Sequence, residues 1–140
     1  MKILSTIVFM WSFIFAFSTV ASADFVKFFY NEQNGNNYFI NLKSIQRQHD
    51  RTIAWCRNQF RDSRSYGGFS SVELKMQADC RHNKLQALKM VAYNKEGRVL
   101  STDSIVTALP LDPGTPNYMV FKIICGKKTP KQTLKHSVHL

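Results

Sequence analysis

Apolar and polar residues alternate along much of the chain after residue 24, and this alternation predicts strands. The clearest case runs from Ser71 to Cys80. Its apolar residues are Val72, Leu74, Met76 and Ala78. Because successive side chains of a strand point to opposite faces, these four share one face and Cys80 points with them. We therefore expect Cys80 to face the core.

Five other segments have the composition of strands. They are 25–30, 38–42, 51–60, 84–93 and 98–105. Asn34-Gly35, between the first two, is a hairpin turn signal. Segment 84–93 is rich in helix formers, but it lies between two tight turns, so a meander accommodates it as a strand. Ser44 to Asp50 is polar without a period, and Arg61 to Ser71 is the most loop-like stretch.

One apolar segment near the C-terminal end carries the start and stop signals of a helix. Thr115 suits the N-cap and Pro116 the first helical position, while Gly126 suits the left-handed residue after the last turn. Strands first and one helix last predict an α+β domain. We expect an antiparallel meander of about six strands with this helix packed on one face.

The first 23 residues have the features of a cleaved export signal. Lys2 precedes an apolar run from Ile3 to Val20, and Ala21-Ser22-Ala23 is a cleavage site. The alternative is an uncleaved anchor, since the run approaches ~18 residues. The first cysteine is Cys56, so no lipoprotein anchor is expected after cleavage. We expect a domain over 24–126 and a basic, disordered tail over 127–140.

Three cysteines in an exported chain predict one disulfide and one free thiol. Cys125 ends the apolar helix that should cover the core, so it is the natural partner of Cys80, and the bridge ties the helix to the sheet. Cys56 is then the free thiol. Between Trp55 and Arg57 we expect it to be a small buried hydrophobe rather than a reactive group.

The chain is strongly basic, with 19 Lys and Arg against 9 Asp and Glu and a formal net charge of +10. This balance favours acidic partners, although it is equally consistent with solubility alone. Arginines are dense in and after segment 51–60, and the candidate ligand-binding residues are Arg57, Arg61 and Arg64. An anionic chain can lie across such a band. The alternative is a charged strand edge that prevents aggregation.

The residues that enzymes use are sparse. His49 and His82 are the histidines of the predicted domain, and neither has a metal-ligand spacing or an identified catalytic partner. Paired carboxylates, a phosphate-binding glycine loop and a Cys-x-x-Cys motif are absent from the sequence. We predict no enzyme activity, no cofactor and no nucleic-acid partner, with a basic hydrolase as the distant alternative.

Aromatic residues fall on both faces of the predicted sheet. Phe25, Phe29, Phe39 and Trp55 have the parity opposite to that of Val26, Phe28, Tyr30, Tyr38 and Ile40. An exposed aromatic face marks a partner site or a homodimer interface. The alternative is that loops cover it.

An ordered set of these residues resembles the bacterial surface-adhesin protein E family. The set comprises Tyr38-Phe39-Ile40-Asn41 with Ser44-Ile45, then Ile53 and Trp55, Asp79-Cys80, Tyr93 with Gly97, Pro113-Gly114-Thr115 and Ile124-Cys125-Gly126. The resemblance covers nearly all of the chain after the export signal. It implies an antiparallel sheet with a C-terminal helix, a strand at 84–93 and a bridge between Cys80 and Cys125.

The resemblance also implies a function. The family includes an outer-membrane lipoprotein adhesin that binds host matrix and serum proteins, so we expect an exported, non-enzymatic binding protein without a membrane span after cleavage. Its expected ligands are such host proteins or anionic glycans. This sequence departs from that pattern in lacking the lipidated cysteine and in having Asn41 where aspartate is more frequent. The alternative is a periplasmic envelope or stress protein without a host ligand.

Overall fold

The structure is a computed structural model that describes residues 24–137, so the predicted export signal lies outside the described residues. Its elements are β1 (Phe25–Tyr30), β2 (Asn37–Gln48), β3 (Arg51–Gln59), the short 3₁₀-helix η2 (Ser63–Tyr66), β4 (Ser71–Asp79), β5 (Lys84–Tyr93), β6 (Val99–Leu109), α1 (Pro116–Ile124) and α2 (Pro130–Ser137). Over this range no helix is long and apolar enough to cross a membrane.

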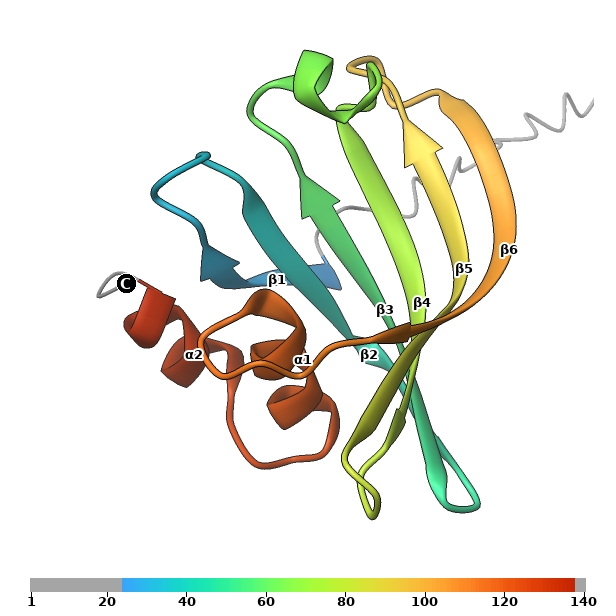
Figure 1. Cartoon of the computed structure of the whole chain (residues 1–140), viewed down its shortest axis with the longest axis vertical. Helices are drawn as coiled ribbons and strands as arrows, with labels where there is room; N and C mark the ends of the chain where they lie inside the picture. Colours follow the sequence, from blue (N-terminus) through green and yellow to red (C-terminus); the bar gives the residue numbers. More distant parts are fainter. Residues whose placement is uncertain (1–23, 138–140) are drawn as a thin grey trace, which may run out of the picture.

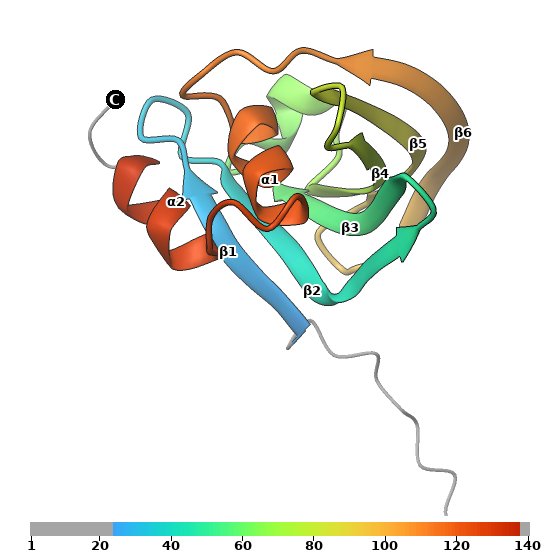
Figure 2. The ribbon, with the colours of Figure 1, turned by 90° about the horizontal axis from the view of Figure 1, so that it is seen from below.

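The six strands form one antiparallel sheet in the order β1-β2-β3-β4-β5-β6. This meander confirms the predicted fold class, including the strand at 84–93. The sheet is strongly twisted, and α1 lies in the hollow of one face (Figures 1 and 2). We call the face that α1 covers the inner face and the opposite face the outer face.

Two strands are longer than their sequence patterns indicated. β2 continues through the polar stretch to Gln48, where it pairs with β3, and β6 continues to Leu109. Ile45 still packs against the core, but Gln46 to Gln48 are exposed and carry no apolar alternation. Backbone pairing with β3 holds them extended instead, from Gln46 opposite Ile53 to Gln48 opposite Arg51.

Helix α1 begins and ends with the predicted signals. The backbone N–H of Tyr118 donates to the Oγ1 of Thr115 at 3.3 Å, and Pro116 is the first helical residue. Gly126 has a φ of 70°, the left-handed conformation that favours glycine. The core joins the inner face to α1 through Phe28, Phe29, Ile40, Ala54, Cys56, Met76, Ala78, Leu85, Met119, Val120, Phe121, Ile123 and Ile124.

The cysteines have the predicted arrangement. Cys80 and Cys125 form a disulfide that joins the end of β4 to the end of α1 across 45 residues. Cys56 is a free cysteine with 1% of its surface exposed. Burial raises the pKa of the Cys56 thiol strongly, so it stays protonated and serves as a core side chain.

The prediction of a disordered tail is wrong for residues 130–137, which form α2 beside β1 (Figure 2). Thr133 is 0% exposed, and its hydroxyl donates to the carbonyl of Phe28 at 2.7 Å. Strand register shifts between Lys27 and Phe29, a β-bulge that leaves Phe28 out of the pairing. The hydrogen bond from Thr133 to the Phe28 carbonyl therefore holds this segment against β1. Its polar composition did not indicate such a contact.

The same bulge corrects the predicted parity of the first strand. Strict alternation places Phe28 and Phe29 on opposite faces, yet both are buried in the core, at 2% and 3% exposure. The extra residue in β1 turns Phe29 to the inner face, where its ring meets that of Tyr38 edge-on at 5.7 Å. Phe25 keeps its expected place on the outer face, opposite Asn41.

Candidate binding site

The three arginines that the sequence singled out occupy three different settings. Arg57 lies on the outer face of β3 in an ion pair with Glu73. Arg61 lies after β3 and its side chain rests on Gly35, where an added Cβ would meet the Arg61 Cδ at 2.6 Å. Arg64 is exposed in η2. The structure therefore brings them into no common arginine cluster, and the charge of Arg57 is already compensated.

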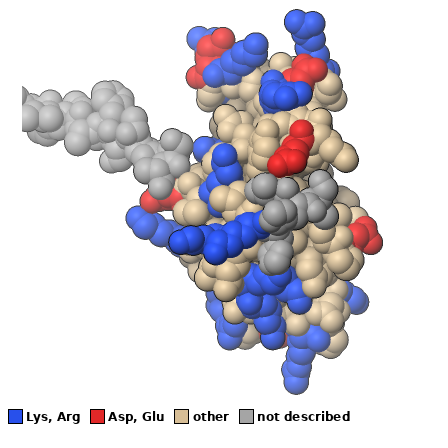
Figure 3. Space-filling model, turned by 90° about the vertical axis from the view of Figure 1, so that its left-hand side faces the viewer, with Lys and Arg blue, Asp and Glu red and all other residues tan. Residues whose placement is uncertain are grey.

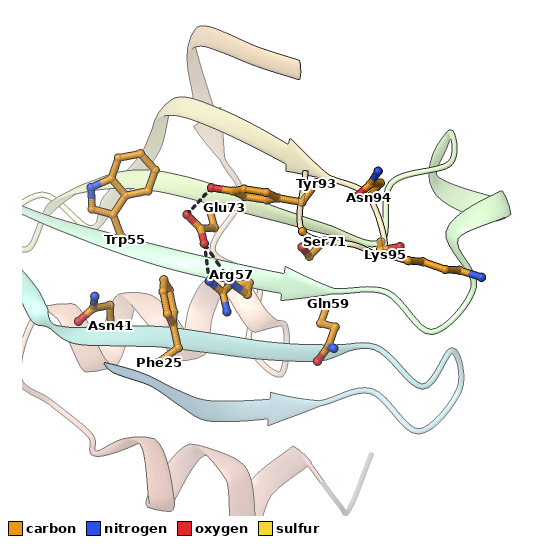
Figure 4. A pocket seen from close by; sticks show the side chains of 12 residues that line it. Phe25, Asn41, Trp55, Arg57, Gln59, Ser71, Glu73, Tyr93, Asn94 and Lys95 are labelled. Atoms are coloured by element: carbon orange, nitrogen blue, oxygen red, sulfur yellow. Dashed lines mark hydrogen bonds and ion pairs between the residues drawn. The ribbon is translucent and has the colours of Figure 1, made fainter. Parts of the chain in front are cut away.

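The outer face is hollowed into a groove of about 500 Å³, which we call the outer groove. It is lined by Phe25, Asn41, Trp55, Arg57, Gln59, Ser70, Ser71, Glu73, Tyr93, Asn94, Lys95 and Gly97. These residues come from β1 to β5 and from the turns that follow β3 and β5. Figure 4 shows Trp55 and Asn41 at one end of the groove, and Lys95, Asn94 and Gln59 at the other.

A network of polar and aromatic groups crosses the middle of the groove. Arg57 donates from Nη2 and Nε to Oε1 of Glu73 at 2.5 and 3.1 Å, and the Tyr93 hydroxyl donates to Oε2 at 3.1 Å. The Arg57 guanidinium also stacks on the Phe25 ring, 4.1 Å from its centroid. Strand pairing sets these positions, since Arg57 lies directly opposite Glu73.

The network affects the acid–base behaviour of Tyr93. Partial burial raises the pKa of Tyr93, and the Glu73 carboxylate raises it further by repelling the phenolate and accepting the hydroxyl's hydrogen bond. The nearby Arg57 charge opposes this effect without cancelling it. Tyr93 therefore remains a neutral hydrogen-bond donor over the physiological range.

Sequence reasoning missed Glu73 and Tyr93 as members of this site. The signal for Glu73 was its parity, because it alternates with the core residues Val72 and Leu74 and must point away from them. Pairing it with Arg57 required the strand register, which depends on the turn between β3 and β4. Tyr93 joins through β5, whose residue Val91 lies opposite Glu73.

The two histidines of the domain lie in turns between strands. His49 has a φ of 54° in the exposed turn between β2 and β3. His82 places Nδ1 2.9 Å from Oδ2 of Asp79, which also pairs with Arg51. Partial burial favours a raised pKa for Asp79, but hydrogen bonds from the His82 ring and backbone and the Arg51 charge outweigh it, so the pKa lies below its ordinary value.

A second surface is marked by charge alone. The described chain after Asp112 has no acidic residue. Its lysines are Lys122, Lys127, Lys128, Lys131 and Lys135. Figure 3, which faces the side of α2, shows basic side chains gathered in its lower half. None of these lysines lines the outer groove.

Comparison with known proteins places the chain in a family. A family model described as surface-adhesin protein E matches residues 25–126. Solved structures of Haemophilus influenzae protein E have the same fold. Crystal form II matches with a TM-score of 0.54 and 18% identity, covering 76% of this chain and 90% of that one. Protein E from non-typeable H. influenzae matches with a TM-score of 0.51 and 16% identity, covering 86% and 92%.

At 18% and 16% identity, the solved structures show only that the fold is shared. Family membership rests on the family model. No curated protein sequence matches the chain. The matched range begins with β1 and ends at Gly126, just after the disulfide, so it contains the whole sheet and α1. The chain belongs to the surface-adhesin protein E family.

Proposed function

We propose that this protein is an exported, non-enzymatic binding protein of the adhesin type, which binds host matrix or serum macromolecules through the outer face of its sheet. The observation that supports this most is the outer groove, where half-buried aromatic rings and side-chain amides lie on a face that no described element covers. Surfaces that bind other macromolecules combine such rings with a polar surround.

Family membership supports the adhesin type, since the family takes its description from a surface adhesin. The arrangement of the histidines supports a non-enzymatic role. His82 is hydrogen-bonded to the carboxylate that caps its own turn, and His49 lies in an exposed turn. Among the described residues, neither histidine forms a hydrogen bond with a serine, threonine or cysteine side chain that it could activate as a nucleophile.

The first test concerns location. Intact producing cells are treated with protease, and this protein is followed by immunoblot beside a periplasmic protein that reports leakage. Loss of the protein while the control survives supports surface display. Protection until the outer membrane is permeabilised would overturn the adhesin proposal and favour the alternative, a periplasmic envelope protein without a host ligand.

The second test concerns the face. Immobilised matrix and serum proteins are incubated with wild type, Trp55→Ala and the control Thr107→Val, an exposed position of β6 that does not line the outer groove. Binding that Trp55→Ala weakens and Thr107→Val leaves intact supports the outer face. Light scattering of the same samples tests whether the chain forms a homodimer. A dimer that Trp55→Ala dissociates would mean that this face binds a second copy.

A further inference from the structure

We infer that the outer groove is a saccharide site, which binds a neutral oligosaccharide through ring stacking and side-chain amides. This inference rests on the proposed function and names the ligand chemistry of the same face. It replaces the anionic chain that the density of arginines suggested.

The backbone beneath most of the groove has no pairing capacity left for a peptide. The groove is lined from β1 to β5, and β2 to β5 each pair with a neighbour on both sides, while the edge strand β1 contributes only Phe25. A peptide strand adds to an exposed sheet edge, where main-chain groups are free. Recognition in the middle of a sheet must therefore use side chains, and a ligand without a strand-forming backbone fits that requirement.

The charges of the groove largely cancel. Of the charged side chains that line it, Arg57 and Glu73 form an ion pair, which leaves Lys95 as the one without a described partner. A sulfated chain gains its affinity from several uncompensated cations along its path. Such cations gather instead on the lysine-bearing side of α2 (Figure 3). The groove is thus suited to a ligand that carries hydroxyls rather than charges.

The side-chain amides of the groove can donate hydrogen bonds to a ligand. Asn41 accepts from the Lys43 backbone N–H through Oδ1, and Asn94 accepts through Oδ1 from two backbone N–H groups of its turn. Both side chains are held in place and keep their NH₂ groups for a ligand. Gln59 is exposed at the same end as Asn94 (Figure 4). Sugar hydroxyls, which both donate and accept, match this set.

Two of the groove's aromatic rings, Phe25 and Tyr93, are held in place before a ligand arrives. Tyr93 is tied to Glu73, which is tied to Arg57, which stacks on Phe25. Trp55 lies on the same face of β3, two residues from Arg57, at the end of the groove where Asn41 lies (Figure 4). Rigid, amphipathic rings bind with little loss of side-chain entropy. From Trp55 to Gln59 the strand rises ~13 Å, enough for a short oligosaccharide.

The experiment uses Trp55 as its own reporter, because it is the only tryptophan after the export signal. The exported protein is titrated with neutral trisaccharides of glucose, galactose and N-acetylglucosamine, and separately with a heparin-derived hexasaccharide. We expect one neutral trisaccharide to change the emission saturably, with a Kd of ~0.1–10 mM. Raising NaCl from about 0.1 to about 0.5 M should change that Kd less than about twofold.

Variants then locate the site by saturation-transfer NMR, which needs no tryptophan. Trp55→Ala and Tyr93→Ala should weaken binding at least about tenfold, Gln59→Ala about threefold, and the control Thr107→Val, outside the groove, not at all. Gln59 is exposed and makes no packing contact with the core, so its variant stays informative if the ring variants unfold. Circular dichroism melts show which variants are folded.

Two results would overturn the saccharide site. One is the absence of a saturable signal with every neutral trisaccharide, and the other is binding of the heparin fragment alone with a steep salt dependence. If matrix-protein binding still depends on Trp55 in either case, the proposed function stands without the saccharide site. If trisaccharides bind but cell-surface proteolysis fails, the saccharide site stands and the adhesin role falls.

Discussion

The inner and outer faces of the sheet are formed by alternate residues of the same strands, and they differ in what covers them. Ile40 and Cys56 on the inner face are 0% and 1% exposed beneath α1. Asn41 and Arg57, the next residues along each strand, line the outer groove and stay half-buried. Alternation thus lets one set of strands hold the fold on one side and present polar and aromatic groups on the other.

The comparison implies that stability and binding can be changed separately. Inner-face groups are removed from water by α1, so altering them changes the free energy of unfolding. Outer-face groups keep access to water, so altering them should change binding with small effects on folding.

The largest effect should follow loss of the covalent tie between the inner face and α1. The double variant Cys80→Ala, Cys125→Ala opens a loop of 45 residues. We expect the free energy of unfolding to fall by about 4 kcal/mol, because the unfolded chain regains the entropy that this loop removed. Urea unfolding measures the change, and dithiothreitol should destabilise wild type but not the variant.

The same variant tests the separation of the two faces. At urea concentrations where it remains folded, it should bind matrix proteins as wild type does, because neither cysteine lines the outer groove. Binding that disappears while the fold persists would mean that the inner face shapes the groove directly. The two faces would then be one coupled unit.

Most of the inner face could be predicted from the sequence, because its signals are local. The alternation in Ser71–Ala78 placed Cys80 toward the core, and Thr115, Pro116 and Gly126 set the limits of α1. The disulfide followed from these two placements. Burial strongly favours one set of alternate residues in each strand facing the core. The sequence alone therefore predicts most of the inner face.

The outer groove could not be predicted to the same extent, since its members come together only through strand register. Arg57 was singled out for its charge, but nothing local shows that Glu73 lies opposite it and cancels that charge. The same limit applies to α2. Its polar sequence gave no sign that Thr133 would meet a carbonyl freed by a bulge 105 residues earlier.

A smaller effect should come from the hydrogen bond that fixes α2. Thr133→Val keeps the side chain's shape but leaves the Phe28 carbonyl without its donor. We expect a loss of about 1–2 kcal/mol in the free energy of unfolding, the cost of an unsatisfied buried acceptor. The control Thr107→Val, at an exposed position of β6, should change it by less than about 0.5 kcal/mol.

Hydrogen exchange adds a local measure for this variant. Amides of α2 should exchange faster in Thr133→Val while those of β3 and β4 keep their protection, because the change acts on the β1 side of the molecule. If stability matched that of the Thr107 control and α2 exchanged as in wild type, α2 would be held by other contacts, and the bulge carbonyl would have another donor.

The smallest change in the free energy of unfolding should follow Glu73→Gln on the outer face, which should nevertheless change the pKa of Tyr93. In Glu73→Gln the carboxylate that repels the Tyr93 phenolate is gone, so the pKa of Tyr93 should fall toward the ordinary tyrosine value. It should remain above that value, because partial burial persists and is the largest cause of the shift. Carbon-13 NMR of labelled tyrosine across alkaline pH follows the titration.

The same variant should lose less than about 1 kcal/mol of unfolding free energy, since the pair it breaks keeps contact with water, with side chains 26% and 17% exposed. Glu96→Gln, in the exposed turn after β5, is the matched control and should leave Tyr93 unchanged. An unaltered Tyr93 titration in Glu73→Gln would show that the two groups do not interact in solution. A loss above about 2 kcal/mol would instead make the outer face a structural element, and the contrast between the faces would no longer hold.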